Sequence, residues 1–542
     1  MSSNLVRGTF ILTLGTFISK FLGLFYVIPF TMIVGTYGTA LYNYGYIPYT
    51  IILSVATAGF PLAISKFVAK YNAIEEYAVG RKLFKSGLLV MLATGFLSFL
   101  FLYFSAPSIA EIVIPNDDLK SNPEDVTSVI RAVSFALIII PFMSLIRGFF
   151  QGNQSMGPSA VSMVVEQIVR IGFLLAGAFA AINIFNGTIV SAVNVATFAA
   201  FIGGLGSIFV LGWYWTKRKH FFDEQLLRDR GTVQVSYKEI YKEVIAYAVP
   251  FTILAIANPL HQLVDQFTFN NAMASIGKAD IAEIAFSVLS FQTFKLIVIP
   301  LALSNAFTLT LVPSITKAFF EQDGRSLHRQ LNQAMQVLLF LTIPATIGLM
   351  VLAEPLYTLF YGYEEGINEL GTIVLTVYAP VTILFAVFGV TSAILQGINQ
   401  QKVMVLSILI GLLIKLVLNV PFIQMFETNG AVYSTAIGYF VSNLINFIVI
   451  KRNLNYQFRF IFRRTLLILI LNIVMLLFVY MSYQALTLIF STKTFIGSFM
   501  IVIVSGAIGV LIYFYLGVKT RLAILLLGKK VETIAKKLRW LK

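Results

Sequence analysis

Residues 395–418 read LQGINQQKVMVLSILIGLLIKLVL, and residues 150–173, which lie 245 positions earlier, read FQGNQSMGPSAVSMVVEQIVRIGF. Each copy starts with a Gln-Gly sequence that follows one apolar run and precedes the next, and runs of about 20 apolar residues are long enough to cross a bilayer. Each copy also carries one basic residue at the same place, Arg170 in the first and Lys415 in the second. These two stretches indicate an internal repeat built from membrane-spanning helices.

The composition also indicates a polytopic membrane protein. Of the 542 residues, 58% are hydrophobic and 12% are charged, which is about half the charged fraction of a soluble domain. The absence of cysteine excludes disulfides and thiolate metal sites. No G-x-x-x-x-G-K-[ST] phosphate loop or H-E-x-x-H pair occurs, and the predicted outer loops are short. We therefore expect a transporter rather than an enzyme, with a scaffold that does not transport as an alternative.

Apolar runs separated by polar or Pro/Gly clusters predict fourteen membrane-spanning helices. Their expected limits are 8–34, 43–69, 83–106, 126–150, 158–184, 188–215, 241–271, 284–312, 330–353, 370–396, 402–425, 429–450, 460–486 and 495–518. Basic residues test this count, because they are enriched in short cytoplasmic loops. With the N-terminus inside, thirty of the 39 lysines and arginines fall on the inner face, three fall outside and six fall within helices. This distribution predicts that both termini are cytoplasmic, and the net charge of +15 needs no nucleic-acid partner.

The repeat predicts how these helices are grouped. Ser65-Lys66 matches Thr316-Lys317 and Ala106-Pro107 matches Glu354-Pro355, at offsets close to 245. Each copy then holds six helices, so both copies enter from the same side and are related by a pseudo-twofold axis along the membrane normal. We expect an all-α polytopic protein with an N-lobe over 1–215, a basic amphipathic linker over 216–240, a C-lobe over 241–452, two extra helices within 453–518 and a basic C-terminal helix over 519–542. Repeats of this kind usually form a transporter with the substrate path between the lobes.

Charged residues inside the predicted helices are the candidates for function, because each is costly in hydrocarbon unless it faces water, a partner or a substrate. Six are basic and two are acidic: Lys20, Arg131, Arg147, Arg170, Lys295 and Lys415, and Glu166 and Asp265. Four of the cations lie near the middle of their helices, two in each lobe: Lys20, Arg170, Lys295 and Lys415. Such a group predicts a cavity for an anion such as a phosphate or a pyrophosphate.

Structural roles compete with this interpretation. Glu166 and Arg170 are four residues apart, so they share a helix face and can neutralise each other. Arg131 and Arg147 lie near helix ends, where an arginine can reach the headgroup layer. An interhelical pair with Asp265 could absorb one of the lysines.

Two further features concern coupling and movement. His261 and Asp265 are four apart and form either a structural pair or a proton-coupling pair. Prolines interrupt several predicted helices and can act as hinges. The preferred hinge candidates are Gly59 with Pro61, and Pro250.

Several motifs resemble one known family. They are RGTF at 7–10, ISKFLG at 18–23, AGFP at 58–61, RGFFQG at 147–152, EQ at 166–167 followed by Arg170, and AILQG at 393–397. Together they resemble the MurJ family of lipid II flippases in its Gram-positive branch, the polysaccharide biosynthesis or stage V sporulation protein B-like group. The wider superfamily comprises the multidrug/oligosaccharidyl-lipid/polysaccharide exporters. The resemblance extends over essentially the whole chain.

The resemblance implies alternating access between two six-helix lobes, and a groove made by helices thirteen and fourteen for a lipid tail. It also implies that cations near the first helix bind pyrophosphate, and Lys20 matches one of them. Two other basic positions of Gram-negative members fall on Tyr26 and on the uncharged stretch 51–54. Arg147, Arg170, Lys295 and Lys415 are therefore our candidates for the missing charge. Some members bind sodium between helices seven, eleven and twelve, where the polar candidates here are Asn258, Asn419 and Thr435.

From this resemblance we expect a multi-pass protein of the bacterial cytoplasmic membrane that moves undecaprenyl-pyrophosphate-linked lipid II from the inner to the outer leaflet. The expected drive is the membrane potential or a Na⁺ or H⁺ gradient, with no bound cofactor. Expected partners are lipid II or a similar polyprenyl-pyrophosphate glycan, the phospholipid bilayer and the cell-wall synthesis machinery. The alternatives are a flippase for teichoic acid, capsule or exopolysaccharide units, and a multidrug/cation antiporter of the same superfamily.

Overall fold

The computed structural model describes residues 2–57, 59–115, 119–233, 236–301, 315–316, 318–456, 459–527 and 529–537. Within these ranges the chain consists of helices and short connections, and no strand occurs. It divides into two compact units, Met1–Asn271 and Ala272–Lys542. The all-α fold predicted from the apolar runs is confirmed, whereas the predicted limits of the lobes and of the linker remain predictions.

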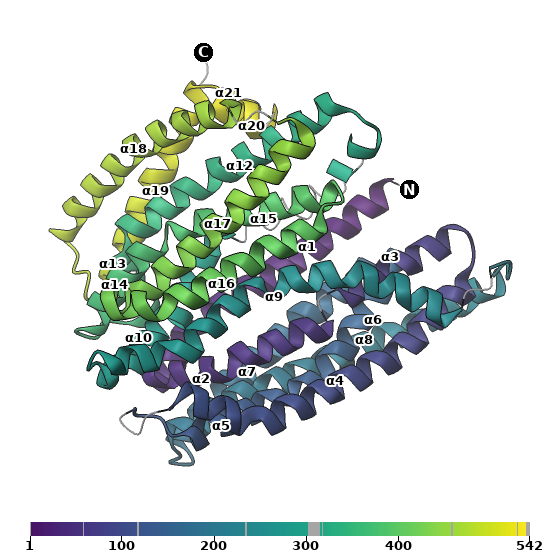
Figure 1. Ribbon diagram of the computed structural model, residues 1–542, viewed down its shortest axis with the longest axis horizontal. Coiled ribbons are helices and arrows are strands. Elements are labelled where there is room, and N and C mark those ends of the chain that lie inside the picture. Colours follow the sequence, from purple (N-terminus) through teal and green to yellow (C-terminus); the bar gives the residue numbers. More distant parts are fainter. Residues whose placement is uncertain are drawn as a thin grey trace. The chain divides into compact units, whose positions relative to one another are not determined.

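Unit 1 is built from the first nine helices (Figure 1). They are α1 (Ser2–Phe25), α2 (Val27–Thr57), α3 (Phe60–Ala73), α4 (Tyr77–Val113), α5 (Pro123–Ser134), α6 (Ala136–Gly152), α7 (Met156–Asn183), α8 (Ile189–Leu227) and α9 (Tyr237–Ser275), whose last residues belong to unit 2.

Unit 2 contains the remaining elements. They are α10 (Ala279–Ser287), the π-helix η1 (Val288–Thr293), a helical segment over 294–301, α12 (Gly324–Val351), α13 (Ala353–Tyr361), α14 (Ile367–Tyr378), α15 (Val381–Gly397), α16 (Gln401–Phe426), α17 (Thr428–Leu454), α18 (Arg459–Thr487), α19 (Phe495–Lys519), α20 (Leu522–Leu527) and α21 (Lys529–Lys537).

Among the described residues, twelve stretches are long and apolar enough to cross a membrane. One of them, 11–73, covers the first two predicted spans, and the predicted span 241–271 is not among the twelve. The chain is therefore a multi-pass membrane protein, while the count of fourteen spans stays a prediction.

Some predicted spans are interrupted in the structure. Helix α2 has a kink at Gly35, directly after the predicted limit of the first span, and the φ of 67° there suits a residue without a side chain. The span predicted at 43–69 is broken, because α2 ends at Thr57 and α3 begins with Pro61 in its first turn. A proline is tolerated there because its missing N–H would have no partner within the helix. The break lies in contact with other helices of unit 1, since a side chain at Gly59 would overlap the Ala248 backbone of α9.

The linker predicted at 216–240 begins as a continuation of α8, which runs to Leu227 before the chain turns into α9. The turn is fastened to the connection between α3 and α4. Arg230 forms an ion pair with Glu75 at 2.5 Å, and the backbone N–H of Thr232 donates to Glu76 at 2.8 Å. Hydrogen bonds and an ion pair therefore fix the path of this stretch on unit 1.

In unit 2, α16 and α17 lie side by side (Figure 1). Small residues permit their close approach, as is common between membrane helices. A side chain at Gly411 would overlap Ser442 Oγ and place its Cβ 2.5 Å from the Gly438 carbonyl oxygen. Ser442 donates to the Ser407 carbonyl of α16 at 2.8 Å, which adds a hydrogen bond across the crossing.

We predict that Gly411→Leu lowers the thermal unfolding midpoint of the purified protein, because overpacking typically costs about 1–3 kcal/mol. Gly506→Leu is the matched control on α19, since no atom lies within 4 Å of a Cβ at that position. Scanning fluorimetry in detergent measures both variants. Equal midpoints for the two variants would show that the α16–α17 crossing does not depend on Gly411.

Candidate functional site

Arg147 of α6 is held by polar side chains from two neighbouring helices of unit 1, α7 and α8. Its Nη2 donates to Glu166 Oε2 at 2.7 Å and to Ser207 Oγ at 2.8 Å, and its Nε donates to Ser162 Oγ at 2.9 Å. The side chains of Arg147 and Glu166 are 14% and 18% exposed. Arg147 is thus held by α7 and α8 inside the unit, and the structure gives no support to the idea that it reaches a headgroup layer.

This pairing leaves Arg170, one turn after Glu166 on α7, with different partners. Its Nη2 donates to Tyr46 Oη at 2.8 Å and to Tyr42 Oη at 3.2 Å, both on α2. Its guanidinium carbon lies 5.3 Å from the centre of the Tyr46 ring. Glu166 pairs with Arg147 rather than with Arg170, so the possible neutralisation within α7 is not what the structure shows. The partners of Arg170 are neutral, and its positive charge is retained.

The phenol groups that orient Arg170 belong to a tyrosine-rich stretch of α2. The rings of Tyr42 and Tyr46 stack with their centres 5.2 Å apart, and Tyr46 also contacts Tyr49 at 5.2 Å. These tyrosines carry no charge, so they were not among the residues predicted from the sequence. Their spacing of three and four residues places them on one helix face, and this spacing was the available signal.

Lys20 lies on α1, which packs against α7. Gln167 Nε2 donates to the Ser19 carbonyl at 3.3 Å, and Gly15 faces Ala160. The Lys20 side chain is exposed, and it makes no hydrogen bond or ion pair within the described part of the chain. Helix α1 therefore carries an accessible cation beside the helix that carries Glu166 and Arg170.

Within the predicted spans of α1, α6 and α7, Lys20, Arg147 and Arg170 stand against one carboxylate, Glu166, which leaves an excess of two positive charges. Guanidinium groups bind phosphate oxygens through charge-assisted, often bidentate hydrogen bonds. Arg147 is occupied by Glu166, so Arg170 and Lys20 are the groups available to an anion. This arrangement can hold an anionic group but has no nucleophile–base pair for covalent chemistry among the described side chains.

The two candidate cations of unit 2, Lys415 and Lys295, differ in burial and in their neighbours. Lys415 of α16 is fully buried, and its Nζ donates to Thr435 Oγ1 of α17 at 2.7 Å. One turn along α16, Asn419 is also fully buried, and its Oδ1 accepts from Ser434 Oγ at 2.5 Å. Lys295 is half-buried, with its Nζ 5.6 Å from the centre of the Phe291 ring.

The sodium site implied by the resemblance can be tested on these residues. Thr435 Oγ1 accepts from the Lys415 ammonium and donates to the Ala431 carbonyl at 2.7 Å. Two unit charges 4 Å apart repel by about 4 kcal/mol at an effective dielectric constant of about 20. Asn419 and Thr435 therefore do not fit a metal ion while Lys415 is present. Asn258, the third candidate, lies on α9 in unit 1.

The polar residues of α9 are anchored to α2. Gln266 Nε2 donates to the Tyr44 carbonyl at 2.8 Å, and Asn270 Nδ2 donates to Tyr44 Oη at 2.8 Å. His261 and Asp265 on the same helix are buried. Of the hinge candidates, Pro61 adjoins Gly148 of α6, where an added side chain would place its Cβ 2.5 Å from the Pro61 carbonyl oxygen. The break between α2 and α3 is thus in contact with the segment that carries Arg147, and Pro250 lies within α9.

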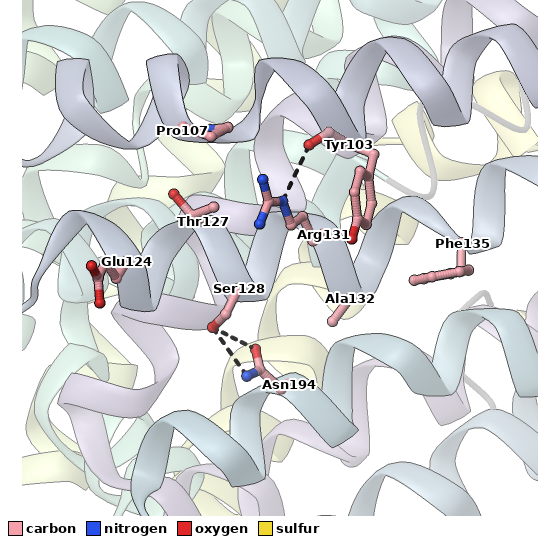
Figure 2. A pocket seen from close by; sticks show the side chains of 9 residues that line it. All are labelled: Tyr103, Pro107, Glu124, Thr127, Ser128, Arg131, Ala132, Phe135 and Asn194. Carbon is pink, nitrogen blue, oxygen red and sulfur yellow. Dashed lines mark hydrogen bonds between the residues drawn. The ribbon is translucent and has the colours of Figure 1, made fainter.

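A cavity of about 650 Å³ lies in unit 1 away from these residues, between α4, α5 and α8 (Figure 2). Arg131 of α5 stands in it, donating from Nε to the Tyr103 carbonyl at 3.4 Å and lying 4.9 Å from the centre of the Tyr103 ring. Ser128 and Asn194 hydrogen bond across the cavity. Arg131 is therefore stabilised by a neighbouring aromatic ring and is separate from the network of Arg147 and Arg170.

Comparison with solved structures places the fold in a known class. A lipid II flippase MurJ in an inward closed conformation superposes with a TM-score of 0.62 and 16% identity, covering 94% of this chain and 99% of that one. An inward-facing multidrug resistance MATE family transporter also gives 0.62, with 17% identity over 80% of this chain and 94% of that one. The protein is thus a multi-pass helical membrane protein with the fold shared by MurJ and MATE transporters.

The family follows from sequence comparison. Residues 5–319 match the polysaccharide biosynthesis protein family, and residues 243–420 match the MatE family. The chain is 46% identical over 539 residues to the lipid II flippase MurJ of Bacillus subtilis (strain 168), covering 99% of both chains. It is 25% identical to stage V sporulation protein B of the same organism over 76% of both. The chain belongs to the polysaccharide biosynthesis protein family and, within it, to the MurJ group.

We predict a strong coupling between Arg147 and Glu166 in a double-mutant cycle. Arg147→Met and Glu166→Gln each leave one buried partner uncompensated, which typically costs about 3–5 kcal/mol. The double variant leaves no such charge, so it should lose clearly less stability than the sum of the single variants. Thermal unfolding midpoints of the four purified proteins measure this. Additive losses would mean that the ion pair does not exist.

Proposed function

We propose that this protein is a lipid flippase that translocates lipid II, the undecaprenyl-pyrophosphate-linked peptidoglycan precursor, from the inner to the outer leaflet by alternating access. The observation that carries the proposal is the 46% identity to a lipid II flippase over 99% of both chains. The excess positive charge on α1, α6 and α7 supports it, because the proposed substrate carries a pyrophosphate.

In this proposal, Arg170 and Lys20 bind the pyrophosphate, each in a different way. Arg170 is pre-oriented by the hydroxyl groups of Tyr42 and Tyr46, so little side-chain freedom is lost when it binds phosphate oxygens. Lys20 is exposed, so its ammonium is accessible to the anion. Arg147 contributes indirectly, since its pairing with Glu166 removes a carboxylate that would otherwise repel the substrate or neutralise Arg170.

The lipid tail needs an apolar surface, and α18 and α19 offer one in unit 2. Their exposed side chains are largely aliphatic or aromatic, among them Phe462, Leu466, Ile473, Ile503 and Val510. The pair is docked on α12 by two bonds: Arg464 Nη1 donates to Gln336 Oε1 at 2.6 Å, and Tyr513 Oη donates to the Phe340 carbonyl at 2.9 Å. We propose this surface as the seat of the polyprenyl chain.

The drive we propose is the membrane potential across the bacterial cytoplasmic membrane, with both termini inside. A potential that is negative inside favours outward movement of an anion by about 2.3 kcal/mol per charge per 100 mV. Proton coupling through His261 and Asp265 is the alternative drive. The released lipid would then be available to the cell-wall synthesis machinery, the remaining partner that we predict.

A multidrug/cation antiporter has the same fold, but it needs a carboxylate in its cavity to attract cations. In unit 1 Glu166 is paired with Arg147 at 2.7 Å, and a guanidinium lies one turn away on α7. Even when Asp265 of α9 is counted with Glu166, the cations Lys20, Arg147 and Arg170 outnumber the two carboxylates, which disfavours a cationic drug. A flippase for teichoic acid or capsule units shares the pyrophosphate group and differs only in the glycan.

We predict that Arg170→Ala, at normal protein level, fails to support growth when the native copy is depleted, because the pre-oriented phosphate donor is lost. Tyr46→Phe should retain partial activity, since it removes one hydrogen bond and leaves the charge. Lys219→Ala, an exposed lysine on α8 outside this cluster, is the matched control and should grow normally. Complementation assays with immunoblots measure all three. Normal growth of Arg170→Ala would remove Arg170 from the binding site.

A further inference from the structure

Arg170 and Lys415 occupy equivalent positions in the repeat, 245 residues apart, yet the two halves use them in opposite ways. Arg170 is half-buried and is held by phenol groups. Lys415 has no exposed surface, and its ammonium donates to Thr435 Oγ1 of the neighbouring helix at 2.7 Å. One position of the repeat can therefore present its cation to a ligand, whereas the other encloses its cation between two helices.

Polar side chains of α16 and α17 surround the place where Lys415 is bonded. Thr435 Oγ1 faces the ammonium, and Asn419 lies one turn along the same face of α16. Ser434 Oγ donates to Asn419 Oδ1 at 2.5 Å, and Thr435 Oγ1 donates to the Ala431 carbonyl at 2.7 Å. These polar groups are buried within the α16–α17 pair, and the close approach at Gly411 keeps this space small.

We propose that the Lys415 ammonium is a covalently attached cation that takes the place of a monovalent metal ion between α16 and α17. The chain therefore binds no Na⁺ at this place, and its helix pair is stabilised at any sodium concentration. Removing the ammonium while leaving the oxygens would create a site that a small free cation can enter. A larger cation such as choline would be excluded by the close packing of the two helices.

The test compares unfolding midpoints of the purified full-length protein in NaCl, methylammonium chloride and choline chloride at equal ionic strength. The wild type should give the same midpoint in all three salts. Lys415→Ala should have a lower midpoint in choline chloride. NaCl and methylammonium chloride should each raise it by about 2–4 °C, as expected when a ligand binds only the folded state.

Two further variants make the result specific. Lys415→Met keeps the length of the side chain without the charge, so it should be destabilised and should not respond to any of the salts. Lys402→Ala, at an exposed lysine near the start of α16, should behave as the wild type. A sodium-dependent midpoint in the wild type would overturn the proposal, and this arm does not depend on the folding of a variant. A folded Lys415→Ala protein whose midpoint is the same in all three salts would also overturn it.

The functional consequence rests on the proposed flippase activity and is measured separately. Lipid II translocation by the wild type in liposomes should have the same rate when Na⁺ is replaced by choline on both sides. A rate that falls at least tenfold without Na⁺ would contradict the attached-cation proposal. Absence of translocation in both salts would contradict the proposed function and leave the unfolding experiment as the test of Lys415.

Discussion

A charge inside an apolar helix must be compensated by its neighbours, and this constraint determines the arrangement of both units. In unit 1 the Arg147–Glu166 ion pair, supported by Ser162 and Ser207, joins α6, α7 and α8. Because Glu166 is paired with Arg147, Arg170 donates hydrogen bonds to Tyr42 and Tyr46 of α2 instead. The pair therefore fixes three helices and also leaves a neighbouring guanidinium charged without a carboxylate.

The two copies of the repeat have diverged in how they meet this constraint. Unit 1 holds the half-buried Arg170 on tyrosine hydroxyl groups and adds the exposed Lys20. Unit 2 buries Lys415 completely and uses it to hold α16 to α17. In the function that we propose, the first half of the repeat binds the substrate headgroup, while the second half keeps an internal charge that holds two helices together.

The sequence predicted the helices well, because apolar length and polar breaks report directly on bilayer crossing. The spans expected at 158–184 and 402–425 correspond to α7 and α16 within two residues at each end. Breaks inside a span were missed, such as that between Thr57 and Phe60, because Pro61 is compatible with either a kink or a new first turn.

The charged residues of the candidate site were predicted from the sequence, but their interaction partners were not. The spacing of four residues on one helix suggested that Glu166 neutralises Arg170. The observed partner of Glu166 is Arg147 of α6, nineteen positions earlier in the chain. Contacts between helices depend on crossings set by small residues such as Gly411 and Gly438, which a single sequence does not locate. The tyrosines of α2 were missed because they carry no charge, although their spacing of three and four residues places them on one helix face.

The central claim is that the protein delivers lipid II to the outer leaflet. The most direct measurement is to deplete the protein in its own host, in cells without a second flippase, and to quantify the lipid II that is accessible outside intact cells. After depletion, we expect accessible lipid II to fall while total lipid II accumulates, and wild-type protein to restore the outer pool. An unchanged outer pool would mean that this protein does not deliver lipid II to the outer leaflet.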